Sequence, residues 1–243
     1  MRSSSDFQNK PARAWVFSSL VGLAFVSWAG LSLAAEPKPA PAPAVAPATT
    51  PAPEAVTLET LLGAFQKMPG LEARFVEDKH IGLLAAPLQS QGRLYFVPPG
   101  LLARHTDSPT KSSVVIAPDA VRYSDSEGSG RIDLSARPDV RLFVESFVRV
   151  LAGDRAGLER IYALRFDPAA PDGQGWALEL APLGPPLKEL VTRLRIRGRG
   201  LAVTEIRVDE ASGDHSVTRI LEADPQRRFT PDERKRLFDV APR

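Results

Sequence analysis

The chain has 243 residues, a formal net charge of +2, no cysteine, three histidines and 23 prolines. Charged residues make up 25% and hydrophobic residues 43% of it, which excludes a wholly disordered chain and a membrane protein with several spans. The lack of cysteine excludes a disulfide framework, a cysteine-based zinc site, a thiol nucleophile and an acylated lipobox cysteine.

The first 35 residues have the pattern of a secretory signal. Arg2, Lys10 and Arg13 precede an apolar run over residues 14–35 that ends in small residues. We therefore expect cleavage after Ala34 or Ala35 and export across the inner membrane into the periplasm. An uncleaved membrane anchor is the alternative, because the run approaches the ~20 residues that span a bilayer.

Residues 36–56 are predicted to be a linker rich in proline and alanine. Seven of the 23 prolines lie here, and they favour an extended polyproline spacer over a helix or a strand. Removal of residues 1–35 takes away three basic residues and one acidic residue, which leaves 28 of each sign. A nucleic-acid partner is therefore not expected.

Residues 57–243 form one predicted domain that begins and ends with helices. Thr57 caps a helix whose apolar residues recur at steps of three and four, and Pro69-Gly70 ends it. A longer amphipathic helix covers residues 139–152, a short one covers 155–162, and the last begins at Thr230 and runs to Phe238.

Most of the remaining sequence alternates apolar and polar residues, as strands do. The predicted strands are residues 71–80, 88–97, 101–106, 112–117, 120–124, 131–134, 163–167, 176–180, 192–197, 202–210 and 216–223. Ten or eleven strands with few helices predict a mainly β (α+β) fold, in which helices cover one face of a curved antiparallel sheet.

The sequence contains no recognisable enzyme signature. A nucleophile elbow, a P-loop, a dinucleotide-binding glycine motif and a zinc-protease motif are all absent. His80, His105 and His215 are far apart and have no partner at helical ligand spacing, so we expect three separate surface or turn histidines and no metal site. The chain is therefore predicted not to be an enzyme.

Four arginines alternate along one predicted strand. Arg193, Arg195, Arg197 and Arg199 are spaced by two, which places their side chains on one face. One interpretation is a track for lipid headgroups or a charged partner. The other is the solvated face of a half-buried strand.

The apolar residues also allow two interpretations. Phe143, Phe147 and Leu151 belong to the long amphipathic helix, which either packs against the sheet in an ordinary core or roofs a lipid-sized cavity. Periodicity alone does not separate the two.

Several short motifs resemble a known family. They are LEARFVE at residues 71–77, GRLYF at 92–96, PGL at 99–101, SP at 108–109 and VVI at 114–116. In this order they are similar to the LolA-type periplasmic carriers of outer-membrane lipoproteins. Residues 153–154, 176–182 and 206–213 are similar to a divergent branch of that family, and the likeness covers most of residues 57–238.

The resemblance implies an incomplete barrel of eleven strands, LolA-like, closed by a lid of helices around acyl chains. It also implies lipoprotein or other lipid cargo, an inner-membrane donor complex and an outer-membrane acceptor, and we expect a monomer without a cofactor. The predicted cavity residues are Leu94, Phe96, Leu102, Val115, Phe143, Phe147, Leu151, Leu178, Leu180 and Ile206. The predicted docking or headgroup contacts are Arg104, Arg193, Arg195 and Arg197.

Two positions depart from the family pattern. Pro98 stands where better-known carriers have an arginine that ties the lid to the barrel, and Arg104 replaces a common aromatic residue. The lid lock and the delivery partners of those carriers are therefore not carried over. The alternative function is a periplasmic sensor or protein-binding domain that uses the same fold without transporting lipid.

Overall fold

The computed structural model describes residues 56–169 and 175–239. The predicted signal segment and residues 36–55 of the predicted linker lie outside this range, so both stay predictions. No helix within the described ranges combines the length and apolar character needed to cross a membrane.

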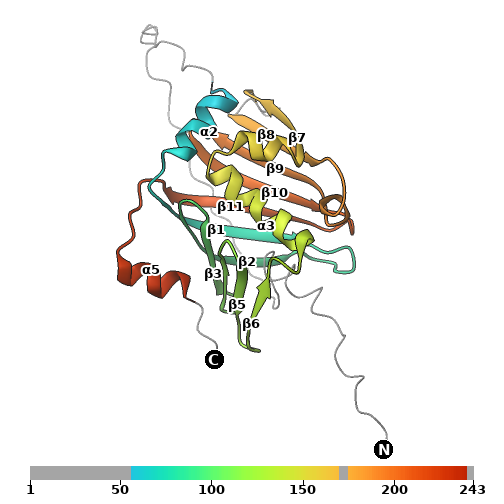
Figure 1. Cartoon of the computed structure of the whole chain (residues 1–243). Coiled ribbons are helices and arrows are strands. Elements are labelled where there is room, and N and C mark those ends of the chain that lie inside the picture. Colours follow the sequence, from blue (N-terminus) through green and yellow to red (C-terminus); the bar gives the residue numbers. More distant parts are fainter. Residues whose placement is uncertain (1–55, 170–174, 240–243) are drawn as a thin grey trace, which may run out of the picture.

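Eleven antiparallel strands form a single curved sheet (Figure 1). The prediction of a mainly β fold is confirmed. The strands are β1 (Leu71–His80), β2 (Leu88–Val97), β3 (Leu101–Ser108), β4 (Ser112–Ile116), β5 (Ala120–Ser124), β6 (Ser129–Asp133), β7 (Tyr162–Asp167), β8 (Trp176–Pro182), β9 (Val191–Arg199), β10 (Ala202–Glu210) and β11 (His215–Asp224).

The sheet consists of two meanders joined in the middle. Its strand order is β6-β5-β4-β3-β2-β1-β11-β10-β9-β8-β7. The first and last strands along the chain, β1 and β11, pair with each other, with Glu77 opposite Thr218 and His80 opposite His215. Strands β6 and β7 are therefore the two edges, and the sheet stays open between them.

Two of the four α-helices in the described residues lie where the chain passes from one edge of the sheet to the other, and the other two lie before β1 and after β11. They are α2 (Leu58–Gln66), α3 (Pro138–Leu151), α4 (Arg155–Glu159) and α5 (Pro231–Phe238), and a short 3-10 helix, η1, covers Leu187–Glu189. Helices α3 and α4 connect β6 to β7, so α3 crosses one face of the sheet (Figure 1). We call this the inner face and the opposite one the outer face.

Two hydrophobic clusters separate the faces. Helices α2 and α3 pack on the inner face, where Leu61 and Phe143 share a cluster with Leu194. Helix α5 belongs to the outer face, where Phe229 and Phe238 pack with a cluster made of Tyr95, Val97, Ala103 and Val115. Because strand residues alternate between the faces, this assignment gives the direction of the strand side chains wherever the register is regular.

Two predicted boundaries are corrected by local contacts. Strand β6 begins at Ser129, earlier than the predicted residue 131, because Asp125 accepts hydrogen bonds from the backbone N–H groups of Glu127 and Gly128 and closes the turn there. The helix predicted over residues 155–162 ends at Glu159. Tyr162 instead begins β7, where its hydroxyl donates a buried hydrogen bond to Ser146 Oγ at 2.8 Å.

Gly153 allows α2 and α3 to approach each other. Its φ is +65°, and an added Cβ would lie 2.2 Å from the backbone oxygen of Leu62. Gly63 in α2, by contrast, has no heavy atom within 4 Å of an added Cβ. We expect Gly153→Ala to lower the free energy of unfolding by about 1–3 kcal/mol through strain.

The matched variant Gly63→Ala should raise the free energy of unfolding by about 0.5–1 kcal/mol, because alanine favours a helix. Urea denaturation followed by circular dichroism measures both. Equal stability of the two variants would contradict the proposed close approach of α2 and α3.

Candidate functional site

Helix α3 covers part of the inner face of the sheet. Its apolar stripe places Phe143 and Phe147 side by side, with their rings in an edge-to-face contact at 5.2 Å between centroids. Val140, Val144 and Val150 on the same stripe are buried. The aromatic pair therefore faces the sheet and not the solvent.

Polar contacts help to fix the position of α3. Ser146 is fully buried in the middle of α3, where it donates to the backbone oxygen of Leu142 and accepts from the Tyr162 hydroxyl. Burial raises the pKa of Tyr162, so its hydroxyl keeps its proton at neutral pH. At the end of α3, Arg149 forms an ion pair with Asp154, which caps α4.

A cavity of about 430 Å³ lies between α3 and the sheet. Apolar side chains from α2, from α3 and from both halves of the sheet make up most of its wall. They are Phe65, Met68, Leu71, Ala73, Leu94, Leu102, Val114, Ile116, Phe143, Phe147, Val150, Leu151, Ile196, Leu201, Ala202, Val203, Ile206, Val208, Ile220, Ala223 and Pro225. The volume falls within the range of about 300–1,000 Å³ that is usual for small-molecule sites.

The inner face is therefore not filled by side chains. Leu94, Leu102 and Ile206 point toward α3 and yet are only half-buried. Leu201, at the turn between β9 and β10, lines the cavity and is 56% exposed. The cavity thus opens to solvent near this turn, where Arg199 also contributes to the wall. The apolar residues of α3 therefore cover an open cavity and do not simply pack against the sheet in an ordinary core.

Six of the ten predicted cavity residues line this volume, and four do not. The six are Leu94, Leu102, Phe143, Phe147, Leu151 and Ile206. Phe96, Leu178 and Leu180 also project from the inner face, but they are at most 1% exposed. Close packing leaves none of their atoms on the open volume, so assigning them to the cavity was wrong.

Val115 points to the other face. It packs in the cluster beneath α5, while its neighbours Val114 and Ile116 line the cavity. The prediction therefore assigned the wrong residue of β4 to the cavity face. All three residues are apolar because both faces of this strand are covered.

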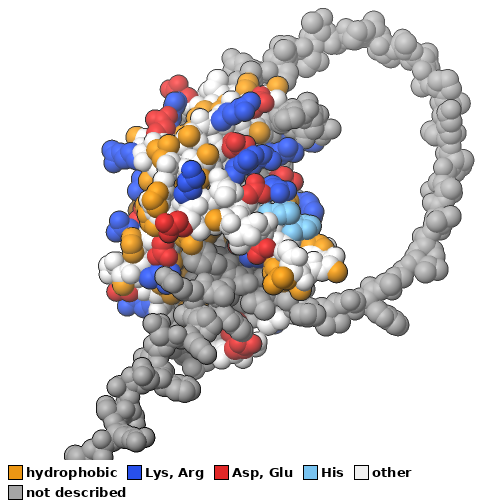
Figure 2. All heavy atoms as spheres, turned by 90° about the vertical axis from the view of Figure 1, so that its right-hand side faces the viewer, with side chains coloured by type: hydrophobic (Ala, Val, Ile, Leu, Met, Phe, Trp, Pro, Cys, Tyr) orange, Lys and Arg blue, Asp and Glu red, His pale blue; other side chains and the backbone are white. Residues whose placement is uncertain are grey.

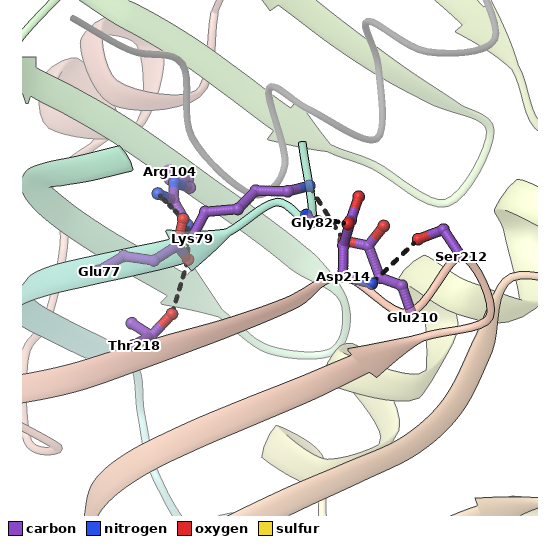
Figure 3. Close-up of polar contacts among 8 residues, drawn as sticks. All are labelled: Glu77, Lys79, Gly82, Arg104, Glu210, Ser212, Asp214 and Thr218. Carbon is purple, nitrogen blue, oxygen red and sulfur yellow. Dashed lines mark hydrogen bonds and ion pairs between the residues drawn. The ribbon is translucent and has the colours of Figure 1, made fainter. Parts of the chain in front are cut away.

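Arg104 was predicted to be a docking or headgroup contact. The structure instead places it in a buried polar cluster at the cavity wall (Figure 3). Its guanidinium donates to both carboxylate oxygens of Glu77, at 3.0 and 3.1 Å. It also donates to Ser90 and lies over the ring of Phe75, 4.2 Å from the centroid. Thr218 donates a further hydrogen bond of 2.7 Å to Glu77.

A second ion pair lies beside this cluster (Figure 3). Lys79 Nζ is 3.0 Å from Glu210 Oε1, and the two side chains are 5% and 19% exposed. Buried pairs contribute little net stability, but loss of one partner leaves an uncompensated charge. The apolar cavity thus has one polar end, which consists of groups already bound to one another.

The predicted arginine row lies mostly on the outer face. Arg195 is 3.2 Å from Glu179, and Arg193 is 3.7 Å from Glu179 and 4.0 Å from Asp209. Arg197 shares their face by strand alternation. Arg199 differs from them, because it lies at the cavity wall.

The prediction of three separate histidines was wrong. His80 and His215 stack across β1 and β11, with ring centroids 4.4 Å apart and planes 10° apart. His105 Nε2 contacts the backbone oxygen of Leu237 at 2.8 Å, so this nitrogen carries the proton. Its Nδ1 then accepts from Ser113 Oγ at 3.0 Å.

These contacts give His105 a structural role, because its two ring nitrogens link β3 to Leu237 of α5 and to Ser113 of β4. Among residues 56–169 and 175–239, no group of three or more side chains could hold a metal ion.

Sequence reasoning missed part of the cavity wall. Phe65 and Met68 belong to the predicted stripe of the first helix, which was not assigned to the cavity. Glu77 was also missed, and only the register of β1, β2 and β3 brings it to Arg104. Ile116 lies directly opposite Leu102, so it would have been assigned to the cavity had the pairing of β3 with β4 been known.

Comparison with known proteins gives one family match over most of the chain. A model described as outer membrane lipoprotein carrier protein LolA-like matches residues 50–227. No curated protein matches the chain.

Several solved structures are similar at low sequence identity. A LolA superfamily protein from Nitrosomonas europaea is 14% identical, with a TM-score of 0.42, over 76% of this chain and 99% of that chain. A DUF1329 family protein from Desulfovibrio piger is 14% identical, with a TM-score of 0.44, over 75% and 94%. The Pseudomonas aeruginosa MucA/MucB complex matches at 12% identity and a TM-score of 0.40, over 71% of this chain and 56% of that chain.

The polar end of the cavity gives a stability prediction. We expect Arg104→Met or Glu77→Leu to lower the free energy of unfolding by about 3–5 kcal/mol, because each leaves a buried charge without its partner. The double variant should lose less than either single variant, since no charge then stays behind.

A matched control is Asp119→Asn, which breaks an ion pair with Arg131 whose side chains are 54% and 60% exposed. It should change the free energy of unfolding by no more than about 1 kcal/mol. Denaturant titrations measure the full cycle. Additive losses in the double variant would contradict the coupling.

Proposed function

This chain belongs to the LolA-like outer membrane lipoprotein carrier family, and from that premise we propose that it is a periplasmic lipid carrier. It binds the acyl chains of lipoproteins, or of another lipid, in the cavity under α3 and carries them toward the outer membrane. The observation that carries this proposal is the open, apolar volume of about 430 Å³ between α3 and the inner face.

The chemistry of the wall supports acyl chains as the ligand. Half-buried side chains such as Leu94, Phe147 and Ile206 expose apolar surface inside the cavity. Each methylene that an acyl chain buries there contributes about 0.8 kcal/mol to binding. The attraction is non-directional, so the site selects apolar chains without requiring a specific head.

A carrier must also release its ligand, and α3 is the element that has to move. Its buried apolar stripe packs on the inner cluster, and its polar contacts include Ser146 with Tyr162 on β7 and Arg149 with Asp154 at the start of α4. Displacement of α3 would widen the opening near Leu201, which already lies between the cavity and solvent. We therefore assign α3 the role of the lid.

The proposal needs no covalent chemistry and no cofactor. The protein acts by binding and release, receives lipid from an inner-membrane donor and delivers it to an outer-membrane acceptor. Pro98 stands where better-known carriers have their lid arginine, so contact between lid and sheet here depends on other residues. The buried ion pair of Glu77 with Arg104 forms the polar end of the cavity.

Lipid extraction tests the proposal directly. The protein, purified without detergent from bacterial envelope extracts, is extracted with organic solvent and analysed by mass spectrometry. We expect acyl-chain lipid in near-stoichiometric amount. Extracts without acyl lipid, together with no saturable uptake of a fluorescent fatty acid, would refute the carrier and leave the protein-binding alternative.

Phe147→Glu should abolish lipid retention, because it places a carboxylate among the apolar side chains of the cavity wall. Leu94→Glu should have the same effect from the sheet side. The control is Leu221→Glu, which makes the same change of charge at a side chain that is 53% exposed and not part of the cavity wall.

Bound lipid per protein, measured on variants whose circular dichroism matches that of the unchanged chain, decides the outcome. Retention by a folded Phe147→Glu protein would remove α3 from the site.

A further inference from the structure

The loop between β1 and β2 is apolar and exposed. Residues 81–87, which we call the apolar loop, read IGLLAAP and carry no charge. Leu83 is 95% exposed and Leu84 is 40% exposed, while Gly82, Ala85, Ala86 and Pro87 are exposed as well. Exposed apolar segments of this kind are where soluble proteins contact membranes or partners.

The apolar loop is held in shape from its base (Figure 3). The backbone N–H of Gly82 donates to Asp214 Oδ1 at 3.0 Å, and the N–H of Leu84 donates to the backbone oxygen of Ile81 at 2.9 Å. The ion pair of Lys79 with Glu210 joins the same two hairpins, three residues before Gly82. The leucines are thus presented on a fixed turn that is tied to the β10–β11 hairpin.

An arginine-rich surface continues from this loop across the outer face. The register places His80, His215, Asp209 and Arg193 in one row across four strands. The next row, two residues farther from the loop along the strands, contains Arg195, Arg207 and Asp78. The row after that contains Arg197, Glu205 and Arg219. We call these three rows the arginine face.

The arginine face carries five arginines against three acidic residues, and Glu179 on the neighbouring strand β8 adds a fourth carboxylate beside Arg193 and Arg195, so one positive charge stays in excess. Figure 2 shows the histidine side chains between a band of charged side chains and an apolar patch at the margin of the molecule. An uncharged apolar tip is therefore bordered by a surface with an excess of positive charge.

We propose that the apolar loop inserts into the surface of a lipid bilayer while the arginine face contacts anionic lipid headgroups. The arrangement matches a bilayer in order of depth, because leucines belong in hydrocarbon and arginines belong among phosphates. The protein would then approach a membrane by its own surface, without requiring an acceptor protein for contact.

A bilayer fits this surface better than a protein partner does. The tip is a protrusion of leucine, alanine and proline without aromatic anchors, whereas protein interfaces centre on aromatic and arginine residues in pockets. The loop carries no charged or hydrogen-bonding side chain, so only its backbone groups have to be desolvated when it enters the bilayer surface, and the N–H groups of Gly82 and Leu84 are already hydrogen-bonded. The acidic partners on the arginine face reduce its attraction to phosphates but leave a net positive surface.

This inference extends the proposed carrier function but does not depend on lipid in the cavity. The apolar loop lies outside the cavity wall, so a variant in the loop should keep its bound acyl lipid. Vesicle binding therefore tests the membrane contact, and lipid extraction tests the carrier.

The experiment is vesicle flotation with soluble protein recovered from envelope extracts. Vesicles of phosphatidylethanolamine with phosphatidylglycerol should bind the protein, and vesicles of phosphatidylcholine should bind it more weakly. Leu83→Glu should lower the partition coefficient at least about tenfold, since it removes one leucine from hydrocarbon. Leu221→Glu, at another exposed leucine, should bind as the unchanged chain does.

Two further readouts locate the contact. Leu83→Trp should show a blue-shifted emission and quenching by brominated acyl chains when vesicles are added. Binding should also weaken when the ionic strength rises from about 0.1 M to 1 M, because the Debye length falls from about 10 Å to about 3 Å.

Three results would overturn the proposal. The first is no binding of the unchanged protein to either kind of vesicle, and the second is equal binding by Leu83→Glu. The third is conversion of a dimer to a monomer by Leu83→Glu without any effect on vesicles, which would assign the loop to contact between two copies of the chain.

Discussion

The route of the chain between the two edges of the sheet determines the rest of this structure. Because β1 pairs with β11, the two meanders join in the middle and leave β6 and β7 at opposite edges. The segment from residue 134 to 161 must therefore cross a face of the sheet, and it does so as α3. A curved sheet and a single crossing helix do not fill the space between them, so an apolar volume of about 430 Å³ stays open.

Strand alternation then distributes the chemistry between the two faces. On the inner face, apolar side chains line the cavity, and the buried pair of Glu77 with Arg104 lies at its polar end. On the outer face, the same strands carry the ion pairs of Arg193 and Arg195. The β1–β11 ladder connects both features, because it brings Thr218 to Glu77 on one face and His215 to His80 on the other.

Most of the fold was predictable from sequence, because proline and glycine breaks separate segments with clear periods of two or of three to four residues. The site was predictable only in part, for reasons that involve tertiary structure. In β4, Val114, Val115 and Ile116 are all apolar, and sequence does not show that α5 covers one face and α3 the other. Phe96 and Leu94 share a face, but only the tertiary packing around each side chain decides which of them borders open space. The contacts of Arg104 with Glu77 and of His80 with His215 depend on strand register, which the sequence pattern does not specify.

The central claim is that acyl chains occupy the volume between α3 and the inner face. Photo-crosslinking tests it most directly, with a fatty acid that carries a diazirine near the end of its chain and with the modified peptides identified by mass spectrometry. The account predicts saturable labelling of α3 residues 143–151 and of the facing β10 residues 202–208, reduced by excess unlabelled fatty acid. Labelling that is confined to the outer face, or that does not saturate, would contradict the account.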